Sequence, residues 1–215
     1  MVHKSLSVVF VVLVVLSSAG VGSAQELWKF NDFSAAYERF LYEVVSWEGV
    51  WDQGLADEVI SEITFHEHWE LGVSQRGMEV SMGYRYWLPL EEADTTLTFM
   101  GAALSSLPIR KEAEGLAEYM LLGLSASDLE LEVGNTIQLF DGSRVRVVEE
   151  ETVAGIQGYL LRKSISDTDE AGNKVDVVTS EWVIAPDIAW PLAVRLYQDG
   201  ELFFQKTLVE YEVYK

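Results

Sequence analysis

The sequence predicts an α+β domain that is mainly antiparallel β-sheet. Three observations support this fold class. Apolar and polar residues alternate with the two-residue period of a half-buried strand, most clearly over 78–88. Asp-Gly pairs at 141–142 and 199–200 join apolar runs, which is typical of hairpin turns. Two other segments, 31–44 and 111–124, carry apolar residues at helical spacing instead.

The first expected helix covers residues 31–44. Asn31 or Asp32 can cap its N-terminus, and apolar side chains recur at intervals of three and four along it. These side chains are Phe33, Tyr37, Phe40, Leu41 and Val44. The last part, from residue 42 to 47, also fits the start of a strand.

Strands are expected next at 63–71 and 78–88, where every second residue is apolar. A further short β-prone piece follows at 95–100. The second helix is expected over 111–124, because its apolar stripe contains no β-branched residue and Pro108 precedes it.

From residue 137 onward, the pattern of apolar runs and turn residues predicts an antiparallel meander. Gly155 and Gly158 bracket a bend or bulge, and 167–174 is a polar turn. The later strands are expected at 159–165, 175–184, 192–197 and 202–213. No linker interrupts the chain after the N-terminal segment, so residues 25–215 are expected to form one domain.

Residues 1–24 have the three parts of a signal peptide. Lys4 supplies a positive start, 6–16 is almost entirely apolar, and small residues at 22–24 suit cleavage before Gln25. The alternative is an uncleaved anchor, but the apolar run is short for a hydrocarbon layer of ~30 Å. The mature protein is therefore expected to be soluble and periplasmic, or otherwise extracytoplasmic.

The composition excludes several classes of function. The chain carries 15 Lys and Arg against 35 Asp and Glu, a formal charge of −20, which excludes a nucleic-acid groove or an anionic-membrane patch. With no cysteine, it has no disulfide, thiolate nucleophile or iron–sulfur cluster. An apolar fraction of 49% argues against a disordered acidic chain, so the acidity is taken as a soluble surface.

Motifs for catalysis or metal binding are weak. His66 and His68 point the same way on a strand, but they would need a third ligand to hold zinc. Asp167 begins a calcium-like loop, yet Ala171 and Val178 stand where oxygen ligands belong. No nucleophile elbow, phosphate-binding loop or dinucleotide fingerprint is complete. We expect no enzyme, no metal and no cofactor.

The C-terminal part carries a recognisable order of motifs. They are Val153-Ala-Gly155, Tyr159, Trp182-Val-Ile-Ala-Pro186-Asp187, Trp190-Pro191-Leu192 and Asp199-Gly200. This order resembles the bacterial LolA/LolB-like lipoprotein-carrier superfamily over about residues 135–215. The segment 25–134 matches that superfamily in outline, through its exported leader, early helix and inserted helices.

This resemblance implies an antiparallel sheet curled into an unclosed half-barrel, with helices covering its concave face. It also implies a carrier or sensor that binds a lipid, a lipoprotein acyl chain or another amphiphile, with an envelope membrane protein as a second candidate partner. Strand alternation and the implied curvature then suggest the residues that line the apolar concavity. They are Phe65, Trp69, Tyr84, Tyr86, Phe99, Leu160 and Trp182.

Two other functions remain open at this point. One is an envelope protein-interaction module without a small ligand, whose aromatic surface docks a partner and whose acidic face steers a basic one. The other, less favoured, is a metal-dependent hydrolase that uses His66 and His68.

Overall fold

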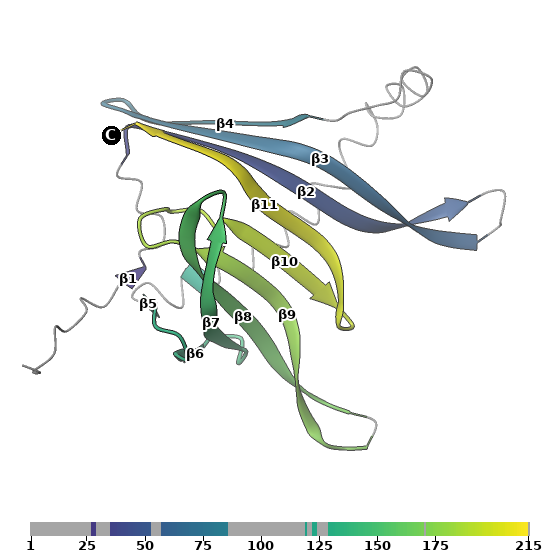
Figure 1. Cartoon of the computed structure of the whole chain (residues 1–215). Helices are drawn as coiled ribbons and strands as arrows, with labels where there is room; N and C mark the ends of the chain where they lie inside the picture. The colour runs from purple at the N-terminus through teal and green to yellow at the C-terminus, as the bar shows by residue number, and fades with distance from the viewer. Residues whose placement is uncertain are drawn as a thin grey trace, which may run out of the picture.

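The computed structural model describes residues 27–28, 35–52, 57–85, 119, 122–123, 129–169 and 171–214. Their main feature is a nine-stranded antiparallel sheet (Figure 1). Its strands are β2 (Tyr37–Asp52), β3 (Asp57–Ser74), β4 (Gly77–Arg85), β6 (Thr136–Gln138), β7 (Arg144–Val153), β8 (Ile156–Thr168), β9 (Lys174–Ile184), β10 (Ala193–Gln198) and β11 (Glu201–Tyr214). A two-stranded sheet pairs β1 (Leu27–Trp28) with β5 (Leu129–Glu130).

The strand order in the large sheet is β4-β3-β2-β11-β10-β9-β8-β7-β6. Each neighbouring pair is consecutive in this numbering, with the exception of β2 and β11. The sheet therefore consists of two meanders, β2–β4 and β6–β11, which are joined along that one pair. Ten residues of each strand face each other there, from the pair Tyr37 and Tyr214 to the pair Ser46 and Phe204.

The predicted α+β class, a half-barrel with helices covering its concave face, is wrong. The sheet is open, because its outermost strands β4 and β6 are not paired with each other. The described residues form no helix that covers a face of the sheet, and none of their helical residues belongs to a helix long and apolar enough to cross a membrane. The predicted leader 1–24 and the predicted β-prone piece 95–100 lie outside the described residues.

The expected helix over 31–44 is the clearest error, because strand β2 begins at Tyr37. Phe40, Tyr42 and Val44 are buried on one face of β2, with partly exposed Leu41 and exposed Glu43 between them. Pairing with β3 on one side and β11 on the other satisfies the backbone of this segment, so long-range partners override a local helical pattern. The alternative of a strand from residue 42 is correct.

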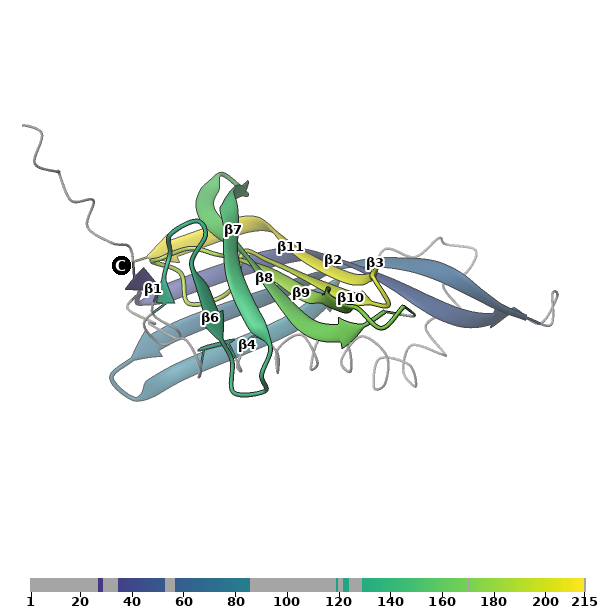
Figure 2. The same ribbon diagram turned by 90° about the horizontal axis from the view of Figure 1, so that it is seen from below.

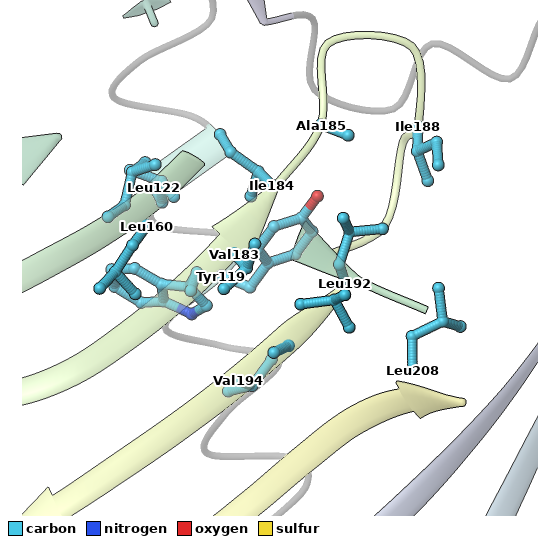
Figure 3. Packing of buried hydrophobic residues seen from close by; sticks show 14 of the residues in the cluster. Tyr119, Leu122, Leu160, Val183, Ile184, Ala185, Ile188, Leu192, Val194 and Leu208 are labelled. Atoms are coloured by element: carbon cyan, nitrogen blue, oxygen red, sulfur yellow. The ribbon is translucent and has the colours of Figure 1, made fainter. Parts of the chain in front are cut away.

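The second expected helix, 111–124, is described at three positions only. Tyr119, Leu122 and Gly123 have helical backbone and are buried. Tyr119 and Leu122 belong to the same buried cluster as Ile184 and Leu208 (Figure 3). The Tyr119 hydroxyl donates a hydrogen bond of 2.5 Å to the carbonyl oxygen of Ala189, which fixes this residue against the chain that links β9 to β10.

The strands of the C-terminal part lie where the sequence predicts them. The segments 159–165, 175–184 and 202–213 fall within β8, β9 and β11, and the segment 192–197 matches β10 except for its first residue. The Asp-Gly turn between β10 and β11 has left-handed φ angles, 52° at Asp199 and 83° at Gly200, as a two-residue hairpin of this type requires. Local turn chemistry therefore specified this half of the sheet.

One row of side chains shows how the two meanders share a core. The register places six residues opposite one another on adjacent strands, and such residues project from the same face. They are Leu161, Trp182, Val194, Lys206, Val44 and Phe65. The five apolar ones are at most 6% exposed. We call this side of the sheet the core face and the other side the opposite face.

The sheet is strongly twisted (Figures 1 and 2), and the β7–β8 hairpin coils over the opposite face. Arg195 on β10 pairs with Glu151 on β7 at 2.6 Å, although β9 and β8 lie between these strands in the sheet. A Cβ atom at Gly158 would lie 2.7 Å from the carbonyl oxygen of Ile184, so this close approach requires glycine.

Candidate functional site

The predicted lining residues separate by face. Those on the core face are Phe65, Trp69, Tyr84 and Trp182. Leu160 lies on the opposite face, because it is paired with Val183, the neighbour of Trp182 in the chain. Tyr86 and Phe99 lie outside the described residues.

Of the five predicted residues that the structure describes, three are close together. Phe65 and Tyr84 make an edge-to-face contact with ring centroids 5.8 Å apart, and half-buried Trp69 lies on the same face of β3. Trp182 is fully buried on β9, with β10, β11 and β2 between it and β3. The described part of the predicted site is therefore the end of the core face that β3 and β4 form.

An exposed apolar surface begins at this end. Met78, Val80 and Met82 project from β4 onto the core face and are 45%, 53% and 48% exposed. Across from Met78 lies Val73 on β3, which is 45% exposed. We call these four residues the β4 strip. Strand β4 lies at the edge of the sheet, where natural proteins usually place charge to prevent association.

The β4 strip continues into the core without a polar break. The β3 partners of Val80 and Met82 are buried Leu71 and half-buried Trp69. Met78, Val80 and Met82 were not among the predicted lining residues, which are mainly aromatic. The alternation over 78–88 was the signal that could have identified them.

Next to Trp69, the core face holds a buried pair of charges. Glu67 is fully buried on β3; its carboxylate accepts a hydrogen bond from Trp69 Nε1 and pairs with the ammonium of Lys206 on β11. The Lys206 Nζ atom lies 4.4 Å from the ring centre of Tyr42 and 5.6 Å from that of Trp69. We call these four residues the lysine cage.

Strand register explains how the lysine cage forms. Tyr42 on the intervening strand β2 is opposite Glu67 on one side and Leu208 on the other. Lys206 is two residues from Leu208, so its long side chain crosses the Tyr42 ring diagonally to reach the carboxylate. Buried charges need such partners, because an unpaired one is strongly unfavourable.

Hydrogen bonding fixes the Tyr42 side of the cage. Its hydroxyl donates a hydrogen bond of 3.0 Å to the carbonyl oxygen of Pro191. Burial raises the pKa of Tyr42 well above its ordinary value, and the nearby Glu67 carboxylate raises it further. Tyr42 therefore remains a neutral donor, and its ring remains a neutral surface for the ammonium.

Aromatic residues extend the cage toward the two-stranded sheet. Trp190 packs on Trp69 with ring centroids 5.1 Å apart, and Tyr119 stacks on Trp190 at 6.2 Å. Trp28 of β1 follows at 5.9 Å from Tyr119. The Nε1 atom of Trp190 is buried, and within the part of the chain that the structure describes it has no hydrogen-bond acceptor.

The opposite face carries a different, polar arrangement. Glu181 is buried on β9 and accepts hydrogen bonds from Arg162 Nε at 2.7 Å and from the Tyr197 hydroxyl at 2.8 Å. Arg195 lies 3.7 Å from the same carboxylate and joins it to Glu151. The pKa of Tyr197 is raised to about 12. Burial is the largest cause, and the hydrogen bond to Glu181 is the second.

A groove of about 650 Å³ borders this polar cluster. Its lining residues are Arg162, Asp167, Asp176, Val177, Val178, Glu181, Tyr197, Asp199 and Gly200. Asp176 forms an ion pair with Arg144. Glu181 is paired with Arg162 and Arg195 and accepts the hydrogen bond from Tyr197. These pairs hold strands β7 to β10 together, which is a structural role.

The histidine pair lies away from the cage. His66 and His68 project from the opposite face of β3, since Glu67 between them is on the core face. Among the residues with described positions, no three His, Cys, Asp or Glu side chains are grouped to hold a metal ion. The calcium-like loop is a hairpin turn, in which Asp169 accepts the backbone N–H groups of Ala171 and Asn173 at 3.0 and 2.7 Å.

Comparison with known proteins gives no family for the chain: no protein-family model matches it, and no curated protein matches it either. The LolA/LolB-like resemblance therefore stays a prediction from the sequence.

Proposed function

We propose that this protein is an exported carrier or sensor that binds an amphiphile, whose apolar chain lies along the β4 strip. The observation that carries the proposal is the continuity of exposed Met78, Val80 and Met82 with half-buried Trp69. Contiguous exposed apolar side chains on a soluble domain mark a binding surface. Methionine suits a ligand of variable shape, because its side chain is flexible and polarisable.

The dimensions of the β4 strip agree with a chain-like ligand. At the usual rise of an antiparallel strand, the distance along β4 from Met78 to Met82 is about 14 Å. The surface is therefore long and one side chain wide on each strand, which matches an extended acyl chain better than a compact ring system. A lipid or an acylated protein is the expected cargo, and the leader predicted at 1–24 from the sequence supports export.

The test compares faces of the same strand. Residues 25–215 are purified, and the dissociation constant of a fluorescent fatty-acid probe is measured for Val80→Asp, Met82→Asp and the control Ser81→Asp. Ser81 is exposed on the opposite face of β4. We expect the two core-face variants to bind at least about tenfold more weakly, because a carboxylate removes apolar contact and adds a desolvation cost. Equal affinities for all three variants would disprove the proposal.

The edge position of β4 favours one second candidate, a protein-interaction module. In the described sheet β4 is paired with β3 alone, so its outer backbone groups can add a strand from a partner. Native mass spectrometry of the protein from a bacterial periplasm separates the two functions. A co-purifying acyl species near one per chain supports the carrier, whereas a ligand-free mass with no lipid uptake supports the interaction module.

A further inference from the structure

We propose that the lysine cage, together with Trp190, binds the polar group of this amphiphile, and that this group is an uncharged hydrogen-bond acceptor such as an ester or amide carbonyl. The inference rests on the proposed function, since it names the chemistry at the inner end of the β4 strip. Three features of the described residues carry it: unused donors, their position, and the charge around them.

The donors come from two side chains. Trp190 Nε1 is buried and lacks an acceptor among the described residues. A buried donor without an acceptor is unfavourable, so a ligand that supplies one gains binding free energy. The Lys206 ammonium has three N–H bonds, and the carboxylate of Glu67 is the one oxygen partner it has in the described part of the chain.

The position of these donors connects them to the β4 strip. Trp69 contacts both the β4 strip and the donors. It is opposite Met82 in the register, its ring centroid lies 5.1 Å from that of Trp190, and its ring centre lies 5.6 Å from Lys206 Nζ. Trp69 and Trp190 are half-buried, whereas Glu67 beneath them is fully buried. The donors thus lie at the boundary between the exposed strip and the closed core.

Charge selects the type of acceptor. Glu67 neutralises Lys206, so the cage offers donors without a net positive charge. The whole chain has a formal charge of −20, which repels a free carboxylate or phosphate at long range. The Lys206 ammonium already lies against the rings of Tyr42 and Trp69, where a cationic head group would otherwise bind. An uncharged acceptor avoids both conflicts.

The experiment compares ligands that share one chain and differ in the polar group. Binding of monododecanoylglycerol, dodecanoate and dodecyltrimethylammonium is measured by calorimetry at pH 8 and low salt, below their critical micelle concentrations. We expect the glyceride to bind about tenfold more tightly than either ion. Equal affinity for the three, or tighter binding of an ion, would overturn the inference.

A variant then assigns the preference to the cage. Trp190→Phe keeps an aromatic ring but removes the donor, so the ratio of glyceride to dodecanoate affinity should fall to near one. Trp47→Phe is the matched control, because Trp47 lies on the opposite face of β2 and should leave the ratio unchanged. A merely structural effect of Trp190→Phe would weaken all three ligands equally and would contradict the inference.

Failure of the inference can be distinguished from failure of the proposed function. If the wild-type protein binds none of the three ligands, the carrier function itself is wrong and the inference falls with it. If all three bind equally and Val80→Asp abolishes their binding, the apolar strip is confirmed and only the choice of polar group is wrong.

Discussion

The ammonium of Lys206 lies 4.4 Å from the ring centre of Tyr42, on the neighbouring strand. This contact lets a lysine occupy the middle of an otherwise apolar row, since its charge reaches Glu67 across the ring. The ion pair of Lys206 and Glu67 therefore connects β11 with β3 across the intervening strand β2. Each charge depends on the other for its stability in the core.

Removal of one charge from this pair should be costly. We expect Lys206→Met to lower the free energy of unfolding by about 3 kcal/mol, because it leaves the Glu67 carboxylate buried without a cation. The double variant Glu67→Gln with Lys206→Met should recover most of that loss. Urea unfolding of the wild type and both variants measures this, and a single variant as stable as the double would contradict it.

Asp141 should make the stability of the β6–β7 hairpin depend on pH. The side-chain hydrogen bond from Ser143, together with Lys163 at 2.9 Å, lowers the pKa of Asp141 from its ordinary value to about 2. A lowered pKa in the folded state gives stability above the unfolded pKa that is lost as the pH falls. Asp141→Asn should thus be less stable than wild type at pH 7.

The difference between the two proteins should shrink between about pH 5 and pH 2, as the wild-type carboxylate becomes protonated. Unfolding in urea at several pH values measures it. A difference that stays constant down to pH 2 would show that the charge of Asp141 has no role.

Gly158→Ala tests the close packing of the coiled β7–β8 hairpin. Its Cβ would lie 2.7 Å from the Ile184 carbonyl oxygen, so strand β8 must move, at a cost of about 1–3 kcal/mol. Gly72→Ala is the control, because nothing lies within 4 Å of its added Cβ. Thermal unfolding should show a lower midpoint for the first variant only, and equal midpoints would contradict the packing.

Glu181→Gln should lower the pKa of Tyr197 from about 12 toward its ordinary value of 10.0. Burial is the largest cause of the raised pKa and stays in the variant, but the charge and hydrogen bond of Glu181 are weakened. NMR titration of ring-labelled tyrosine measures the change. An unchanged pKa would mean that burial alone accounts for it.

Local sequence signals predicted the C-terminal meander and failed at β2. The turn at Asp199 and Gly200 can be recognised from two residues, because its backbone conformation depends on them alone. The spacing of Tyr37, Phe40 and Val44 fits a helix as well as a strand, and only distant β3 and β11 decide between the two. That decision needs information that lies outside any local window.

The candidate site was likewise predicted where local patterns sufficed and missed where distant strands decide. Alternation correctly placed Phe65 and Trp69 on one face of β3, but it could not relate the faces of different strands. Leu160 and Trp182 were therefore grouped together, although the register puts them on opposite sides of the sheet. The pairing of Glu67 with Lys206 joins residues on β3 and β11, so no local pattern predicts it.

The junction of β2 and β11 also determines when the molecule can fold. The β2–β4 meander is synthesised early, yet β2 has no second neighbour until residues 201–214 are made. Contacts between residues so distant in sequence close slowly and late. The N-terminal strands therefore stay without the C-terminal half of their core until β11 has been translated.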